Sequence, residues 1–289
     1  MKIYLNGKFV GKEDAKVSVF DHGFLYGDGA FEGIRSYNGL VFRLKEHIDR
    51  LYETMHTLLL DPKMSKKQMS DAVVATLKAN KLKDAYIRLV VSRGDGDLGL
   101  DPRKCFGRPN VIIITDKITL YPAQLYRDGM AIITVATIKN HPNALNPQLK
   151  SLNYLNNILA KIEATQCGCN EAIMLDANGY VGECTGDNLF ILKNGVLRTP
   201  HLAQLRGITA AAILEVAAKL KIKTAEGFIT RHEVYNADEC FLTGTAAELI
   251  PVVKVDGRAI GMGRPGAVTA KLLKGFKALT AKDGVKYAV

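Results

Sequence analysis

The chain has 289 residues, of which 47% are hydrophobic and 24% charged, and its formal net charge is +10. This length allows one large domain or two modest domains with a substantial core, and no apolar run approaches the length needed to cross a membrane. The basic residues are spread along the chain without interleaved aromatic residues. This distribution disfavours nucleic-acid binding and leaves small anions, or a solvated basic surface, as better explanations of the charge.

The first ten residues read as a β-hairpin around Asn6-Gly7 rather than as a signal peptide. The cysteines are odd in number, and Cys167 and Cys169 form a lone close pair with no second pair to complete a zinc site. The histidines show no metal-binding spacing either. We therefore expect a cytoplasmic protein with reduced thiols and no metal site.

A glycine-rich turn over residues 21–30 is predicted to lead into a strand over residues 31–37. The glycines of this turn let the backbone approach a ligand or a partner chain closely. The apolar stripe that begins at Leu44 predicts a helix to about residue 58, in which His47 and Arg50 lie one turn apart on another face.

A second helix, capped at Ser65, is predicted to run to about residue 80. It is followed by a strand over residues 86–93, whose period of two places Tyr86 and Arg88 on the same face. That face is either exposed to solvent or, inside a cleft, suited to holding a carboxylate. A buried strand is predicted over residues 111–114.

The polar stretch at residues 121–130 is the best domain boundary. It divides the chain into a small N-terminal α/β domain over residues 1–120 and a large C-terminal domain over residues 131–289. The second domain is predicted to alternate strands with helices, and its first strand, residues 131–138, leads towards Lys150.

Lys150 ends a polar, kinked approach and is expected to precede a helix. Ser151 is the expected N-cap, and apolar residues recur at helical spacing from Leu152 to Ile162. A lysine near the positive end of a helix dipole is favoured as the neutral amine, which can form a Schiff base with an aldehyde such as pyridoxal phosphate. The plainer interpretation is a solvated surface lysine, which describes most lysines in proteins.

Two small-residue turns are suited to oxyanions. Gly207-Ile208-Thr209 opens a predicted helix, and Gly244-Thr245-Ala246 follows a predicted strand. Glu183 lies on a strand in which Gly182 leaves room beside it. A phosphate anchor, a lysine and a buried carboxylate together fit a pyridoxal phosphate site. Motifs of serine hydrolases, P-loop enzymes, dinucleotide-binding enzymes and zinc proteases are absent from the sequence.

A series of short stretches, in order along essentially the whole chain, resembles the fold-type IV pyridoxal phosphate enzymes, and among them the branched-chain amino acid aminotransferases. The resemblance implies an α/β (α+β) fold of two domains, like that of D-amino acid aminotransferase, with the cofactor in the cleft between them. The stretches are residues 21–29, 31–35, 46–51, 86–88, 96–102, 150–154, 183–190, 207–209 and 244–248.

The resemblance also implies a role for individual residues. Lys150 would form the Schiff base and shuttle the proton, Tyr154 would bind the phenolic oxygen of the cofactor, and Glu183 would hold its pyridine nitrogen. The residues implied to bind the phosphate are Arg50, Ile208, Thr209 and Thr245. Those implied to bind the substrate are Phe31, Tyr86, Arg88, Tyr121, Thr245 and Ala246, together with Tyr26 and the loop around Leu98–Leu100 from the other subunit of a homodimer or larger homo-oligomer.

The reaction implied is transfer of the amino group of leucine, isoleucine or valine to 2-oxoglutarate, with small molecules and no nucleic acid as partners. A D-amino acid aminotransferase is the nearest alternative, but it uses an Arg-x-His pair where this chain reads Arg93-Gly94-Asp95. An aminodeoxychorismate lyase, or a basic anion- or nucleic-acid-binding protein without enzymatic activity, are further alternatives. One departure from the branched-chain pattern is Ala210, which stands where an arginine is usual.

Overall fold

The computed structural model describes all 289 residues, and the chain divides into two compact units. Lys150 and the end of the chain belong to the first unit although they lie far along the sequence. None of the helices combines the length and the apolar character needed to span a lipid bilayer. The first unit comprises Met1–Ile118, Leu149–Asn153 and Thr280–Val289, and the second comprises Thr119–Gln148 and Tyr154–Leu279.

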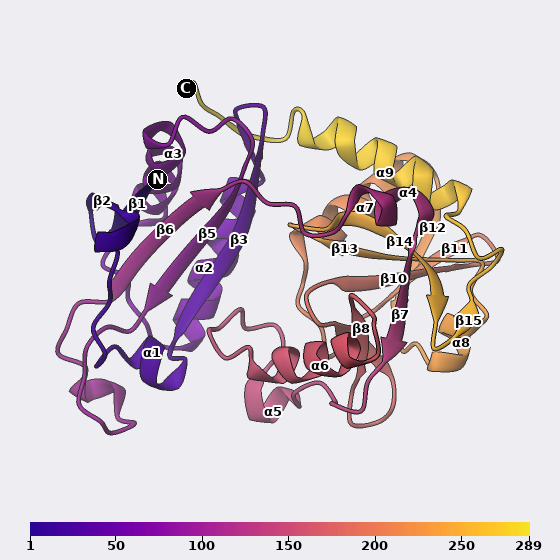
Figure 1. Cartoon of the computed structure of the whole chain (residues 1–289), viewed down its shortest axis with the longest axis horizontal. Helices are drawn as coiled ribbons and strands as arrows, with labels where there is room; N and C mark the ends of the chain where they lie inside the picture. The colour runs from indigo at the N-terminus through magenta and orange to yellow at the C-terminus, as the bar shows by residue number, and fades with distance from the viewer. The chain divides into compact units, whose positions relative to one another are not determined.

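The first unit is built on a seven-stranded sheet in the order β16-β4-β3-β5-β6-β1-β2 (Figure 1). All of its strand pairs are antiparallel, and the last strand of the chain closes one edge beside β4. The strands are β1 (Lys2–Leu5), β2 (Lys8–Gly11), β3 (Gly29–Tyr37), β4 (Leu40–Phe42), β5 (Ala85–Ser92), β6 (Asn110–Asp116) and β16 (Gly284–Lys286).

Two helices, α2 (Leu44–Thr57) and α3 (Lys66–Ala79), share a hydrophobic core with this sheet. The buried positions of β5 alternate, so that Ile87 and Leu89 join the core while Tyr86 and Arg88 point to the other face. Helix α3 begins with a capping box formed by Ser65 and Gln68. The shorter helices of the unit are η1 (Lys12–Asp14), α1 (His22–Tyr26) and η2 (Pro102–Lys104).

The second unit is built on a nine-stranded mixed sheet, in which β12-β11-β10-β13-β14-β7-β8-β9 follow one another and β15 pairs with β14. Its strands are β7 (Met130–Thr134), β8 (Ala172–Leu175), β9 (Val181–Cys184), β10 (Asn188–Lys193), β11 (Val196–Pro200), β12 (Lys223–Gly227), β13 (Glu239–Gly244), β14 (Glu248–Val255) and β15 (Arg258–Ala259). Its helices are α4 (Ala123–Asp128), α5 (Pro142–Leu145), α6 (Leu155–Gln166), α7 (Ile208–Lys219), α8 (Arg231–Tyr235) and α9 (Ala267–Thr280).

Most of the predicted elements are confirmed. The first hairpin turns at Asn6-Gly7 with φ angles of 51° and 91°, as the sequence pattern required. The helix predicted from Leu44 and the strand that carries Tyr86 and Arg88 are both present. Strand β7 is shorter than predicted, since it ends at Thr134 rather than near residue 138.

The helix predicted directly after Lys150 is wrong at its start. The main chain there runs extended along β3: the N–H of Phe31 donates to the carbonyl of Lys150, and Ser151 forms a β-bridge with Ala30. Helix α6 begins only at Leu155, and Ser151 caps nothing. Lys150 therefore lies outside the first turn, where a helix dipole acts most strongly, and that argument for a neutral amine loses its basis.

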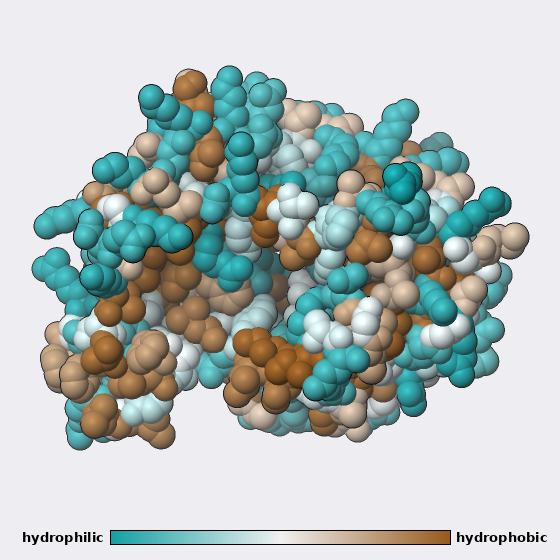
Figure 2. Space-filling model, in the orientation of Figure 1, coloured by the Kyte–Doolittle hydropathy of each residue, from teal (hydrophilic) through white to brown (hydrophobic).

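Helix α6 exposes most of its predicted apolar stripe. The side chains of Leu155, Ile158, Leu159 and Ile162 are 65%, 51%, 47% and 46% exposed, while only small alanines are buried beneath the helix. Figure 2 shows apolar side chains gathered over this segment. We call these four residues the α6 patch. Contiguous exposed apolar surface of this kind is typical of a contact surface.

Candidate active site

Lys150 lies over the ring of Phe31 in the first unit, with its Nζ 4.6 Å from the ring centroid. The guanidinium of Arg88 lies 4.6 Å from the centroid of the same ring, and Phe31 itself is buried. A backbone hydrogen bond between Phe31 and Lys150 holds the two residues next to each other. A predicted nucleophile and a predicted carboxylate-binding group thus share one aromatic platform.

Tyr86 completes this group, because its hydroxyl accepts a hydrogen bond of 3.0 Å from Nη2 of Arg88. Gly33 lies directly opposite Arg88 on β3, and a Cβ at this position would come within 2.2 Å of the Tyr86 hydroxyl. The glycine therefore makes room for the tyrosine. The predicted pairing of Tyr86 with Arg88 on one face of β5 is confirmed.

Arg50 is held by Glu32, a fully buried carboxylate on β3 that the sequence analysis did not single out. Nε and Nη2 of Arg50 donate to the two oxygens of Glu32 at 2.7 and 2.8 Å, and Nδ1 of His47 lies 2.8 Å from the second oxygen. Burial alone would raise the pKa of Glu32, but Arg50 and His47 lower it to about 2. Burial lowers the pKa of His47 despite the neighbouring carboxylate.

Glu183 lies on β9 in the second unit, and both of its oxygens have partners. Lys139 places its Nζ 2.5 Å from Oε1, and the N–H of Leu205 donates to Oε2 at 2.9 Å. The lysine and the glutamate are both buried. Glu183 is therefore a fixed carboxylate, as a partner for a protonated ring nitrogen requires.

The predicted phosphate turns are positioned by neighbouring strands of the second unit. Asn188, at the start of β10, donates to the carbonyl of Leu205, and a Cβ at Gly207 would come within 2.0 Å of its side-chain oxygen. Thr209 is buried in the first turn of the twelve-residue helix α7. Asn188 also pairs with Thr243, just before the second turn. A side chain at residue 207 would displace that of Asn188, whereas glycine leaves the backbone at this helix start bare for an anion.

The remaining predicted residues lie as follows. Tyr154 immediately precedes α6, and Thr245 and Ala246 are half-buried in the turn between β13 and β14. Tyr121 is buried, with its hydroxyl 3.4 Å from carboxylate oxygens of Glu171 and Asp187. In the first unit, the Tyr26 hydroxyl donates to the Leu98 carbonyl at 2.5 Å, which ties α1 to the loop after β5.

Three partners in these groups escaped the sequence analysis: Glu32, Lys139 and Asn188. Each acts on a residue 17 to 44 positions away in the chain, and no local motif links such pairs. The only signal for Glu32 was a charged residue within an otherwise buried strand.

Known proteins resemble this chain over most of its length. The family described as class IV amino-transferases matches residues 29–255. The chain belongs to the class IV aminotransferase family. A Methanocaldococcus jannaschii protein, provisionally named a branched-chain-amino-acid aminotransferase, is 54% identical over 99% of both chains. The branched-chain-amino-acid aminotransferase of Pseudomonas aeruginosa is 41% identical over 95% of this chain and 91% of its own. The crystal structure of the Escherichia coli branched-chain amino acid aminotransferase superposes with a TM-score of 0.94 at 36% identity, over 99% of this chain and 97% of its own.

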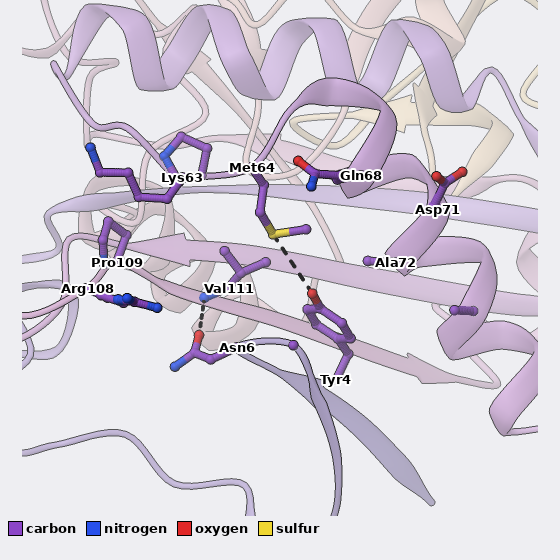
Figure 3. Close-up of a pocket in the computed structure, with 13 residues that line it drawn as sticks. Tyr4, Asn6, Lys63, Met64, Gln68, Asp71, Ala72, Arg108, Pro109 and Val111 are labelled. Carbon is purple, nitrogen blue, oxygen red and sulfur yellow. Dashed lines mark hydrogen bonds between the residues drawn. The ribbon is translucent and has the colours of Figure 1, made fainter.

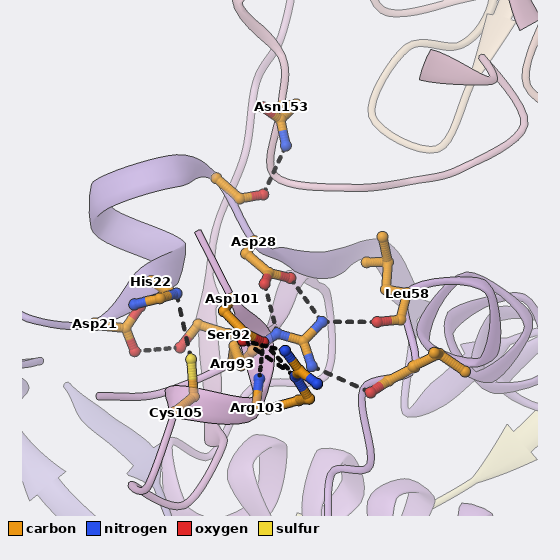
Figure 4. Close-up of polar contacts among 12 residues, drawn as sticks. Asp21, His22, Asp28, Leu58, Ser92, Arg93, Asp101, Arg103, Cys105 and Asn153 are labelled. Carbon is orange, nitrogen blue, oxygen red and sulfur yellow. Dashed lines mark hydrogen bonds and ion pairs between the residues drawn. The ribbon is translucent and has the colours of Figure 1, made fainter. Parts of the chain in front are cut away.

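In this class IV aminotransferase, Arg93 is fully engaged within the first unit (Figure 4). Its Nε and Nη2 bind the carboxylate of Asp28 at 2.5 and 3.0 Å, and the guanidinium also donates to the carbonyls of Leu58 and Leu59. These bonds occupy the guanidinium of Arg93 with partners inside the first unit. Arg93 is therefore not available to hold the carboxylate of a substrate.

A separate cavity of about 560 Å³ lies beside the first hairpin of this aminotransferase and contains none of the predicted site residues (Figure 3). Two of its charged lining residues form ion pairs with neighbouring side chains: Lys63 pairs with Asp61 at 2.8 Å, and Asp71 pairs with Lys67 at 2.6 Å. We assign this cavity no role.

The second unit of the aminotransferase holds two adjacent buried carboxyl groups, Asp187 and Glu171. Burial and the charge of Glu171 raise the pKa of Asp187 to about 7. The folded protein therefore keeps a proton on Asp187 between about pH 4 and pH 7, where the unfolded chain has released it. This difference makes the free energy of unfolding fall as the pH rises through that range.

Replacing Asp187 with asparagine is expected to remove this pH dependence. From pH 5 to pH 8 the free energy of unfolding of the unaltered protein should fall by about 3 kcal/mol relative to that of Asp187→Asn, since one pKa unit corresponds to about 1.4 kcal/mol and the folded pKa lies about two units above pH 5. Urea denaturation of both proteins at the two pH values measures the difference. The lowered pKa of His47 also makes stability depend on pH, but it contributes equally to both proteins and drops out of the comparison. Parallel pH profiles would show that Asp187 is ionised in the folded state.

Proposed function

We propose that this protein is a pyridoxal phosphate-dependent transaminase that moves the amino group of L-leucine, L-isoleucine or L-valine to 2-oxoglutarate. The observation that carries the proposal is the shared platform of Phe31, on which the amine of Lys150 and the guanidinium of Arg88 lie at equal distances. It offers a nucleophilic amine, a site for a carboxylate and an apolar wall, which are the groups that an aliphatic amino acid requires. The names of the relatives support branched-chain amino acids as the amino donors.

The residues present fit pyridoxal phosphate. In the second unit, the bare backbone at Gly207 and the buried Thr209 suit a phosphate, and Glu183 suits a protonated pyridine nitrogen; in the first unit, the guanidinium of Arg50 suits a phosphate. We propose that the residues of both units bind one cofactor, and that Ile208, Thr245 and Tyr154 complete its binding set. The first and second units would then correspond to the small and large domains expected from the sequence.

Pyridoxal phosphate, when bound, supplies an aldehyde that exchanges amino groups and a ring that accepts electrons. In the proposed mechanism Lys150 holds the cofactor and moves the proton at the substrate Cα, while Glu183 keeps the proton at the ring nitrogen in place. Arg88 and the amides of Thr245 and Ala246 bind the substrate carboxylates. Substrate-lining roles are proposed for Tyr26, Phe31, Tyr86 and Tyr121.

Incubation of the purified protein with L-leucine and 2-oxoglutarate tests the proposal, with glutamate as the expected product. Consumption of D-alanine or aminodeoxychorismate without formation of glutamate from L-leucine would replace it with one of the two alternatives on this fold. The structure gives a reason to expect the first result, because Arg93, the arginine that a D-amino acid aminotransferase would use, is already bound by Asp28.

We further propose that the protein is a cytoplasmic homodimer or a larger homo-oligomer. All five cysteines are free thiols, which suits a reducing compartment. The α6 patch provides an apolar surface for a second copy, and Leu98 and Leu100, 69% and 78% exposed, provide another in the first unit.

A charge in the α6 patch is expected to dissociate the oligomer. Ile158→Glu should shift the particle to a smaller species in light scattering at micromolar concentration, since a buried unpaired charge at an interface is strongly unfavourable. Leu59→Glu is the matched control, because Leu59 is 85% exposed and lies outside the patch. An unchanged mass for Ile158→Glu would exclude α6 from the interface.

A further inference from the structure

Lys139 is buried in the second unit and has no part in the proposed chemistry. Only 5% of the residue is exposed, and its Nζ lies 2.5 Å from Oε1 of Glu183. Lysine is almost never buried to this extent unless it is paired. The main chain holds the residue in place, since the N–H of Lys139 donates to the carbonyl of Leu175 at 2.8 Å.

The other contacts of this pair fix its geometry. Nζ of Lys139 donates to the side-chain oxygen of Asn157 at 3.3 Å, and the amide of Asn157 in turn donates to the carbonyl of Thr185 at 2.7 Å. The second oxygen of Glu183 accepts the N–H of Leu205. Two separate segments of the second unit therefore contact the carboxylate, a third holds Lys139, and the cation among the partners of Glu183 is Lys139.

A cation at this distance in a buried site stabilises the ionised carboxylate more strongly than the protonated one. A carboxylate that faces a ring nitrogen shares one proton with it, so the cation also decides where that proton lies. With Lys139 present, the arrangement of an anionic glutamate and a protonated ring is favoured. Without it, the neutral arrangement, with the proton on Glu183, gains in stability.

We propose that Lys139 is a positioning residue that keeps Glu183 ionised, so that the shared proton stays on the ring nitrogen of the bound cofactor. The inference rests on the proposed function, because it requires the ring nitrogen to lie against Glu183. Asp187 and Cys184 are two titratable groups whose charges interact with that of Glu183. Neither carries a positive charge, so Lys139 has no substitute among them.

The test compares Lys139→Met and Lys139→Gln, which remove the charge, with Lys139→Arg, which keeps it. Lys161→Met is the matched control, because Lys161 lies 3.6 Å from Glu171, a different buried carboxylate of the same unit. Each protein is loaded with ¹⁵N-labelled pyridoxal phosphate. The chemical shift of the ring nitrogen, followed against pH, reports its protonation without reference to turnover, and thermal unfolding of each protein reports its fold.

At neutral pH we expect the ¹⁵N chemical shift of the ring nitrogen to move from that of a protonated towards that of an unprotonated pyridine in Lys139→Met and Lys139→Gln. The loss of a nearby opposite charge, which shifts the pKa of a carboxyl by roughly one to three units, moves the shared proton to Glu183. Lys139→Arg and Lys161→Met should stay near the unaltered protein. A folded Lys139→Gln that binds the cofactor with an unchanged titration overturns the inference, as does failure of both uncharged variants to fold, which would assign Lys139 a structural role. Failure of the unaltered protein to bind the cofactor would instead overturn the proposed function.

Discussion

Replacing Lys150 with alanine is expected to reduce glutamate formation from L-leucine and 2-oxoglutarate by at least about 10³-fold. The variant loses both the amine that holds the cofactor and the group that moves the proton, and a positioned acid–base group alone contributes about 10²–10⁴-fold. The side chain of Lys150 is only half-buried, so the fold should persist. The coupled assay for glutamate measures the loss, and Lys161→Ala, which removes another half-buried lysine, should keep full activity.

The same lysine is open to a direct chemical test. Borohydride reduction of the loaded protein should leave a phosphopyridoxyl group on the tryptic peptide that contains Lys150 and on no other. Attachment at a different lysine, or undiminished turnover in Lys150→Ala, would contradict the assignment. Lys139 is an informative alternative to look for, because it is a buried lysine that lies beside a predicted site residue.

The sequence predicted the elements that depend on local patterns. Period-two alternation correctly placed Tyr86 and Arg88 on one face of β5, and Asn6-Gly7 correctly marked a hairpin. The environment of Lys150 was mispredicted, because a serine before apolar residues at helical spacing favours a helix start, whereas a β-bridge to Ala30, more than a hundred residues earlier, holds this segment extended. Long-range pairing overrode a local preference there.

The α6 helix shows a second limit. Helical periodicity correctly indicated that Leu155, Ile158, Leu159 and Ile162 share a face, but it carries no information on what covers that face. The pairing of Lys139 with Glu183 shows a third limit. The two residues are 44 positions apart, and only the approach of the segment after β7 to β9 brings them together.

Glu32 and Asp187 are both buried carboxyl groups, but their surroundings drive them to opposite protonation states. Glu32 meets two basic side chains, and its pKa falls to about 2, whereas Asp187 meets a second carboxylate, and its pKa rises to about 7. The two groups therefore make opposite contributions to the pH dependence of stability. Glu32 stabilises the fold at pH values where its carboxylate is ionised in both the folded and the unfolded chain. Asp187 destabilises the fold at pH values above the ordinary pKa of an aspartate.

Replacing Glu32 with glutamine is expected to lower the free energy of unfolding by about 3 kcal/mol at pH 6, because it leaves the guanidinium of Arg50 buried without its counter-charge. The loss should be constant above about pH 4.5 and shrink as the pH falls towards 2, since the folded carboxylate is protonated only there. Denaturation at pH 6 and pH 3.5 measures both values.

The same variant should also bind pyridoxal phosphate more weakly, because Arg50 loses the acceptor that orients it. We expect the affinity to fall at least roughly tenfold, which is the effect of losing about 1.4 kcal/mol. A variant with lowered stability but unchanged cofactor affinity would show that Glu32 supports the fold alone and that Arg50 is not a phosphate ligand.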